Sequence, residues 1–141
     1  MRPHQMIIKV IYADTDQMGF MHHSNYLKYY EMARWELFRK IGIPYKEIEE
    51  KGTIFPVIDM KISYLKPAYY DDKIMIQTLI VKATGARILF NCKMYNQNEI
   101  LINEATIAIA SVRKSNNKPV LLPPEIKYSI DTFLKKQLVY E

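Results

Sequence analysis

The sequence is short of cysteine and of long apolar segments. Its single cysteine, Cys92, cannot form an internal disulfide, and it lies in the alternating apolar stretch ILFNCKMY, which indicates a buried structural thiol. No apolar run approaches the roughly 20 residues that a membrane-spanning helix needs. With 141 residues, 49% of them apolar, the chain is long enough to bury a core without disulfides. We therefore expect one globular domain over residues 1–141 and no membrane span.

Signals for export and for nucleic-acid binding are also missing. The short apolar run in MRPHQMIIKVIYADTD is followed by aspartates, where a small-residue cleavage site would be expected. The net charge is +5, but the basic residues are scattered and form no nucleic-acid-binding motif. These absences predict a cytoplasmic protein without a nucleic-acid partner, whose positive potential would suit a small polyanionic ligand.

The first third of the chain has a strand pattern followed by a long helical pattern. Residues 6–13, MIIKVIYA, are apolar and β-branched on both faces, which predicts a strand covered on both sides. Residues 22–41 repeat apolar side chains at the spacing of one helical face. Ser24 or Asn25 would supply the N-cap oxygen of this helix.

The rest of the chain alternates mainly with a period of two. Gly42 and Pro44 would end the long helix, and PYKEIEEKG predicts a short second one. Four strand-like runs follow, with Ile58, Met60 and Ile62 on one face of the first, at residues 54–64, 72–84, 87–97 and 99–114. The pattern predicts an α+β fold, in which a curved antiparallel sheet of about five strands wraps around one long central helix.

Two aspartates and two histidines lie around Gly19 in the stretch YADTDQMGFMHHSNY. Their spacing matches no known metal-ligand pattern, so we expect no metal site. As structural groups, Asp14 and Asp16 would cap turn amides. As catalytic groups, they would present a carboxylate beside a helix start, where free backbone N–H groups can polarise a carbonyl oxygen. The residues alone leave both interpretations open.

A longer pattern contains this stretch. The run VIYADTDQMGFMHHSNYLKYYEMARWELFRKIG contains D-T-D-x-x-G-x-x-x-H-x-x-Y followed by Y-x-E-x-A-R-x-E. It resembles the opening of the 4-hydroxybenzoyl-CoA thioesterase family of hotdog-fold proteins, especially the short bacterial acyl-CoA thioesterase branch. The later segments SYLKPAYYDDKIMI and KPVLLPPEI also resemble that family, so the similarity covers nearly the whole chain.

The resemblance implies an acyl-CoA thioester hydrolase that needs no cofactor. Asp16 matches the family's catalytic carboxylate, acting as nucleophile or as general base on water. The backbone amide near His23 matches the donor to the thioester oxygen, and the His23 side chain matches a histidine linked to activity. Because a thioester carbonyl is already activated, one N–H donor and one carboxylate suffice chemically.

Binding residues and assembly are likewise implied by the resemblance. We expect coenzyme A and the acyl group to contact a set of glycine, apolar and basic residues: Gly19, Tyr26, Phe55, Ile58, Arg87, Arg113 and Lys118. Two copies would join their sheets edge to edge into a homodimer, with each pocket between subunits, and dimers would pair into a homotetramer. Two rival functions are thioester hydrolysis on acyl carrier protein and noncatalytic acyl-CoA binding.

Overall fold

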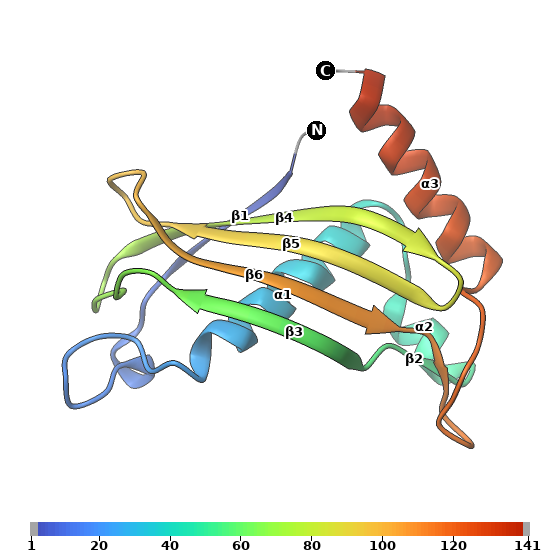
Figure 1. Ribbon diagram of the computed structural model, residues 1–141, viewed down its shortest axis with the longest axis horizontal. Coiled ribbons are helices and arrows are strands. Elements are labelled where there is room, and N and C mark those ends of the chain that lie inside the picture. Colours follow the sequence, from blue (N-terminus) through green and yellow to red (C-terminus); the bar gives the residue numbers. More distant parts are fainter. Residues whose placement is uncertain (1–2, 140–141) are drawn as a thin grey trace.

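The computed structural model describes residues 3–139, and its main feature is an antiparallel sheet laid across one long helix (Figure 1). The sheet has five strands in the order β1-β4-β5-β6-β3. Their bounds are β1 (His4–Lys9), β3 (Val57–Tyr64), β4 (Lys73–Thr84), β5 (Arg87–Tyr95) and β6 (Leu101–Ala110). Helix α1 (Asn25–Lys40) lies against one face, and the short α2 (Tyr45–Glu50) follows it. The α+β class with five strands and a central helix is confirmed.

Helix α1 forms because its apolar side chains share one face and its end is capped. Tyr30, Ala33 and Leu37 are each at most 1% exposed. At the C-terminal end, the Ile43 N–H donates to the Phe38 carbonyl at 2.8 Å and the Gly42 N–H donates to the Arg39 carbonyl at 3.2 Å. This is a Schellman motif, which needs the positive φ of 83° that Gly42 adopts. The predicted helix end is therefore confirmed.

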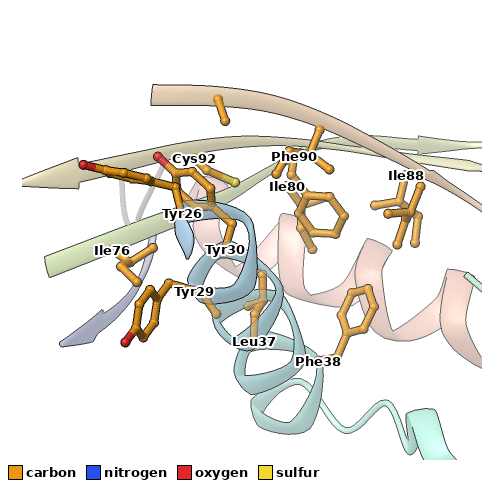
Figure 2. Close-up of a cluster of buried hydrophobic side chains, with 14 of the residues drawn as sticks. Tyr26, Tyr29, Tyr30, Leu37, Phe38, Ile76, Ile80, Ile88, Phe90 and Cys92 are labelled. Carbon is orange, nitrogen blue, oxygen red and sulfur yellow. The ribbon is translucent and has the colours of Figure 1, made fainter. Parts of the chain in front are cut away.

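The core lies between α1 and the inner face of the sheet. Figure 2 shows Tyr30, Leu37 and Phe38 of α1 with inward-pointing side chains of β4 and β5. Cys92 is 1% exposed, and burial raises the pKa of its thiol to about 12. The thiol is therefore protonated at neutral pH, and the predicted structural role of Cys92 is confirmed.

Strand β3 is an edge of the sheet and carries exposed apolar side chains. Val57, Ile58 and Met60 are between 37% and 47% exposed, and Tyr64 is 47% exposed. β3 pairs only with β6 among the described strands, so its outer backbone edge is free. The face containing Ile58 and Met60 is less buried than the period-two pattern predicts, because no described element covers this edge.

Two predicted strands, the first and the last, differ from the sequence predictions. The first strand ends at Lys9, and Tyr12–Asp14 form the 3-10 helix η1. As β1 is the other edge strand, Ile7 is 57% exposed, so the predicted cover on both faces is wrong. The predicted strand at 99–114 breaks at the buried Ser111, where the chain leaves the main sheet. A three-stranded sheet follows there, made by β2 (Thr53–Ile54), β7 (Val112–Arg113) and β8 (Lys118–Pro119).

A third helix, α3 (Pro124–Val139), was not predicted. Pro124 occupies its first position, where a missing backbone N–H costs nothing. Ile126 and Ile130, one turn apart, are at most 1% exposed, and the Lys127 ammonium donates to the Ala83 carbonyl at 2.8 Å. The start signal Pro124-Glu125 and the spacing of the two isoleucines would have indicated this helix.

Candidate functional site

A tight turn positions the Asp16 side chain. Thr15 and Met21 form an isolated antiparallel bridge, and the Asp16 N–H donates to the Phe20 carbonyl at 3.0 Å. The Gly19 N–H donates back to the Asp16 carbonyl at 3.0 Å, and Gly19 has a φ of 88° that favours glycine. The turn therefore fixes the backbone of Asp16 from both sides. Gly19 serves this turn through its backbone.

The Asp16 carboxylate is half-buried, and only one of its oxygens is engaged. Its Oδ1 accepts the Met18 N–H at 2.9 Å, while Oδ2 has no hydrogen-bond partner in residues 3–139. The pKa of the Tyr26 hydroxyl is raised, mainly by burial. A hydrogen bond from the Ala68 backbone lowers this pKa, whereas the charges of Tyr64 and Asp16 raise it further. The Thr15–Met21 bridge closes the turn that holds Asp16, and α1 begins four residues after Met21, at Asn25. One Asp16 oxygen is free for a substrate or a water.

The start of α1 is held by backbone and side-chain contacts to the preceding loop. The Asp14 carbonyl accepts the His22 N–H at 2.8 Å and the Asn25 side-chain amide at 2.9 Å. Ser24 occupies the N-cap position but makes no side-chain cap, because its hydroxyl contacts His22 Nδ1 at 2.8 Å. The prediction that Ser24 or Asn25 supplies a capping oxygen is therefore wrong. The helix start keeps N–H groups that no side chain caps.

His23 lies directly before this helix start. Its ring is exposed and tilted against His22, with ring centroids 4.1 Å apart. Its carbonyl accepts the Tyr64 hydroxyl at 3.0 Å, whereas its N–H donates to no acceptor within the described part of the chain. A carbonyl oxygen placed here would meet an unpaired N–H at the positive end of α1.

Tyr64, which was not predicted as a site residue, joins the end of β3 to this corner. Its ring meets Tyr26 edge-on at 5.2 Å and His23 edge-on at 6.5 Å between centroids. It therefore fixes the helix start relative to the free sheet edge. The only sequence signal was its place on the apolar face of the strand, which does not indicate such a role.

Asp14 is a structural carboxylate. It is 6% exposed, its Oδ1 accepts the Lys28 ammonium at 2.8 Å, and its Oδ2 accepts the Tyr29 hydroxyl. Burial raises the pKa of Asp14, but the bonds from Lys28 and Tyr29 and the charge of Lys28 outweigh it, so the net pKa is lowered. Both oxygens are occupied, which leaves Asp16 as the carboxylate available for chemistry.

Replacing Asp14 with asparagine should lower the free energy of unfolding by about 1–3 kcal/mol, because a buried bond to a charged group is weakened. Lys28 is half-exposed, so solvent screens its share. Since folding lowers the pKa of Asp14, its stabilisation is complete above about pH 4 and is lost as pH falls through the folded value. Urea unfolding at neutral and acidic pH should show the gap between wild type and Asp14→Asn shrinking below about pH 4. A pH-independent gap would contradict this.

The predicted apolar contacts do not converge within one chain. Tyr26 is buried in the first turn of α1, whereas Phe55 lines a cavity of about 310 Å³ farther along α1. Tyr45 stacks against Trp35 at 6.1 Å between centroids and contacts Phe55 at 5.8 Å in the wall of this cavity. Ile58, on the exposed edge strand, lies outside the lining of the cavity. The chain therefore has a corner formed by Asp16 and the start of α1, here called the reactive corner, and a separate cavity lined by both aromatic and charged side chains.

The predicted basic contacts lie at the far end of the sheet from the Asp16 turn. Arg113 on β7 and Lys118 on β8 are directly paired in register, and both are exposed. Arg87 begins β5 and is also exposed. Figure 1 places β2, the neighbour of β7, at the opposite end of β3 from the turn that carries Asp16. Within one chain these cations do not meet the reactive corner.

Residues 3–139 contain no group of three or more histidine, cysteine, aspartate and glutamate side chains that could hold a metal ion. In that same range, no helix is both long enough and apolar enough to cross a membrane.

Known proteins share the sequence pattern and the fold of this chain. Residues 10–130 match the thioesterase-like superfamily. The chain is 37% identical over 113 residues to YneP of Bacillus subtilis strain 168, which covers 80% of this chain and 82% of that protein. It is 34% identical to the acyl-CoA thioesterase YbgC of Haemophilus influenzae, over 85% of this chain and 88% of that one. Among solved structures, the DHNA-CoA thioesterase of Staphylococcus aureus superposes with a TM-score of 0.92 at 25% identity, covering 100% and 97% of the two chains.

Proposed function

Because the chain belongs to the thioesterase-like superfamily, we propose that it is an enzyme that hydrolyses acyl-CoA thioesters to a free acid and coenzyme A. One observation carries the proposal: the free oxygen of Asp16 lies near the uncapped start of α1, where the His23 N–H is unpaired within residues 3–139. A carboxylate beside a free amide at a helix start suits attack on a carbonyl carbon. No serine or cysteine nucleophile is needed.

The reaction uses the two groups in sequence. The thioester oxygen accepts the His23 N–H, and the helix dipole favours the negative charge that develops there. With Asp16 as general base, water adds to the carbonyl carbon while its proton passes to the carboxylate. The tetrahedral intermediate then expels the coenzyme A thiolate, which takes up a proton. With Asp16 as nucleophile, the carboxylate attacks the carbonyl carbon and the C–S bond breaks, which releases the coenzyme A thiolate and leaves an anhydride. Water then cleaves the anhydride to the free acid and the Asp16 carboxylate.

The exposed edge of β3 supports a homodimer. An edge strand with apolar side chains and free backbone groups is suited to pairing with a second copy. In an antiparallel β3–β3 pair, the Val57 end of one strand lies beside the Tyr64 end of the other. The cavity lined by Phe55 and Val57 would then adjoin the Asp16 corner of the partner subunit. Pairing of such dimers into a tetramer is part of the proposal.

The same pairing gives the basic residues a use. Arg113 lies on β7, next to β2 at the cavity end of the sheet, and Lys118 pairs with it from β8, so both would face the partner's reactive corner. Coenzyme A carries several phosphate groups, which exposed arginine and lysine side chains bind and steer. Arg87 is a third candidate at this end of the sheet. The net charge of +5 is consistent with an anionic substrate.

A panel of short aliphatic, long aliphatic and aromatic acyl-CoA thioesters, with matched acyl carrier protein thioesters, tests the function. We expect turnover on coenzyme A thioesters, measured as released thiol. The buried, protonated Cys92 should add little background to a thiol reagent. Turnover on carrier-protein thioesters alone would favour that rival, and binding without turnover on any member would favour a noncatalytic acyl-CoA-binding protein.

A further inference from the structure

The cavity beside α1 has apolar walls and one polar corner. Trp35, Tyr45 and Phe55 form an aromatic wall, and its volume of about 310 Å³ is at the lower end for small-molecule sites. Arg34 and Glu31 line the polar corner. Arg34 lies eight residues beyond Tyr26 on α1, which corresponds to about 12 Å along the helix axis. The polar corner is therefore distant from Asp16 of the same chain.

Arg34 is a buried cation without a bound partner. It is 7% exposed, and among the described residues no carboxylate oxygen lies within 4.0 Å of its guanidinium, which donates no hydrogen bond. Burial lowers its pKa, an effect that Cys92, Glu31 and Tyr45 oppose, and arginine stays charged at neutral pH. Burying a charge is costly unless acceptors compensate it. No Arg34 nitrogen is among the buried atoms of residues 3–139 that lack a partner, so its unused donors open onto the cavity, where a ligand can supply the acceptor.

The surrounding charges restrict what that ligand is. Glu31 and Glu49 also line the cavity, so its ionised side chains are one cation and two carboxylates. A carboxylate-bearing ligand would be attracted by Arg34 but repelled by both glutamates. A hydroxyl group has no charge, can accept from the guanidinium and can donate to a glutamate. The cavity therefore favours a neutral, hydroxyl-bearing group on an otherwise apolar ligand.

We propose that Arg34 is a specificity-determining residue, which selects acyl groups carrying a hydroxyl oxygen over plain hydrocarbon acyl groups of the same length. The inference rests on the proposed thioesterase function and deepens it. In the edge-joined dimer, the acyl chain extends from the partner subunit's Asp16 into this cavity. The hydroxyl then reaches Arg34, while the aromatic wall contacts the methylene groups.

The test compares hexanoyl-CoA and decanoyl-CoA with their ω-hydroxy counterparts and with adipoyl-CoA, which ends in a carboxylate. For wild type we expect the kcat/KM of the hydroxylated thioester to exceed that of the plain one by about 10- to 100-fold, at one chain length or at both. A hydrogen bond to a charged donor contributes a preference of this size. Adipoyl-CoA should be a poorer substrate than ω-hydroxyhexanoyl-CoA. In Arg34→Met, which keeps the length but removes the donors, the ratio should fall to near unity. Arg34→Lys should retain part of it.

Binding gives a readout that does not need turnover. Trp35 is the single tryptophan and lines the cavity, so its fluorescence reports occupancy. Titrations of Asp16→Asn, alone and combined with Arg34→Met or Arg34→Lys, should reproduce the hydroxyl preference and its loss. Ratios of rates or affinities within one variant are independent of the folded fraction.

The outcomes separate the two proposals. Hydrolysis without a hydroxyl preference, or with a preference that Arg34→Met leaves intact, would overturn the role of Arg34 and leave the thioesterase function standing. A hydroxyl preference in the fluorescence titrations that depends on Arg34, without hydrolysis of any thioester by wild type, would overturn the function and support the selective site. A purely structural Arg34 would change stability but not the ratio.

Discussion

Replacing Asp16 with asparagine is expected to lower kcat/KM for acyl-CoA hydrolysis by about 100- to 10,000-fold, the range that a positioned acid–base group contributes. An amide can neither take a proton from water nor form an anhydride, so both roles proposed for Asp16 are lost. The thermal midpoint should stay nearly unchanged, because the amide oxygen can still accept the Met18 N–H that Oδ1 accepts at 2.9 Å. Released thiol and thermal unfolding measure the two effects.

Asp131→Asn is a matched control for this substitution. It makes the same change of carboxylate to amide on α3, where Asp131 forms an exposed ion pair with Lys127 at 2.9 Å. Surface pairs of this kind contribute little, so activity and stability should both remain near wild type. Full activity in Asp16→Asn would exclude the mechanism. Equal losses in both variants would show that the assay responds to something other than the reaction centre.

Mixed dimers of two inactive variants should recover activity. Ile54→Trp would fill the cavity from its wall, and Asp16→Asn would remove the carboxylate. If each site combines Asp16 of one protomer with the cavity of its partner, a dimer with one copy of each variant has one intact site. Co-expression with two affinity tags and purification on both should give about half of the wild-type activity. Each homodimer alone should be nearly inactive.

The same experiment distinguishes the alternative geometry. If Asp16 and the cavity of one chain formed the site, the mixed dimer would contain no intact site and would be as inactive as its parents. A monomer in solution would contradict the proposed β3–β3 pairing directly. Thermal unfolding of Ile54→Trp shows whether the larger side chain is accommodated, and the mixed dimer of wild type with Ile54→Trp is the control for tagging and assembly.

Much of the fold could be predicted because its signals are local. The helical spacing over Tyr30, Ala33 and Leu37 and the stop at Gly42 are confirmed to within a few residues. The points at which strands break were less predictable. The last long strand ends before Ser111 because the Ser111 N–H bonds to the carbonyl of Ala86, which is distant in the sequence. Helix α3 had local signals at Pro124, Ile126 and Ile130 that were not used.

The candidate site was only partly predictable. Asp14 and Asp16 have the same side chain, so the residues alone do not show which one is catalytic. Only the family resemblance favoured Asp16. The structure separates them, since Asp14 is buried with both oxygens bonded while Asp16 keeps one oxygen free in residues 3–139. Tyr64 could not be identified, because its contact with His23 joins residues 41 positions apart.

The sequence by itself determined the central helix, the antiparallel strands and the family, because periodicity, turn residues and a long motif are properties of neighbouring residues. Only the tertiary structure decided which carboxylate is free, which helix-start amide is uncapped and which arginine is buried without a partner. The physical reason is that hydrogen bonding and desolvation depend on groups brought together from distant positions. In the sequence, Arg34 does not differ from the other arginines of the helix. Its burial follows from residues of α2 and the sheet that lie around it in the folded chain.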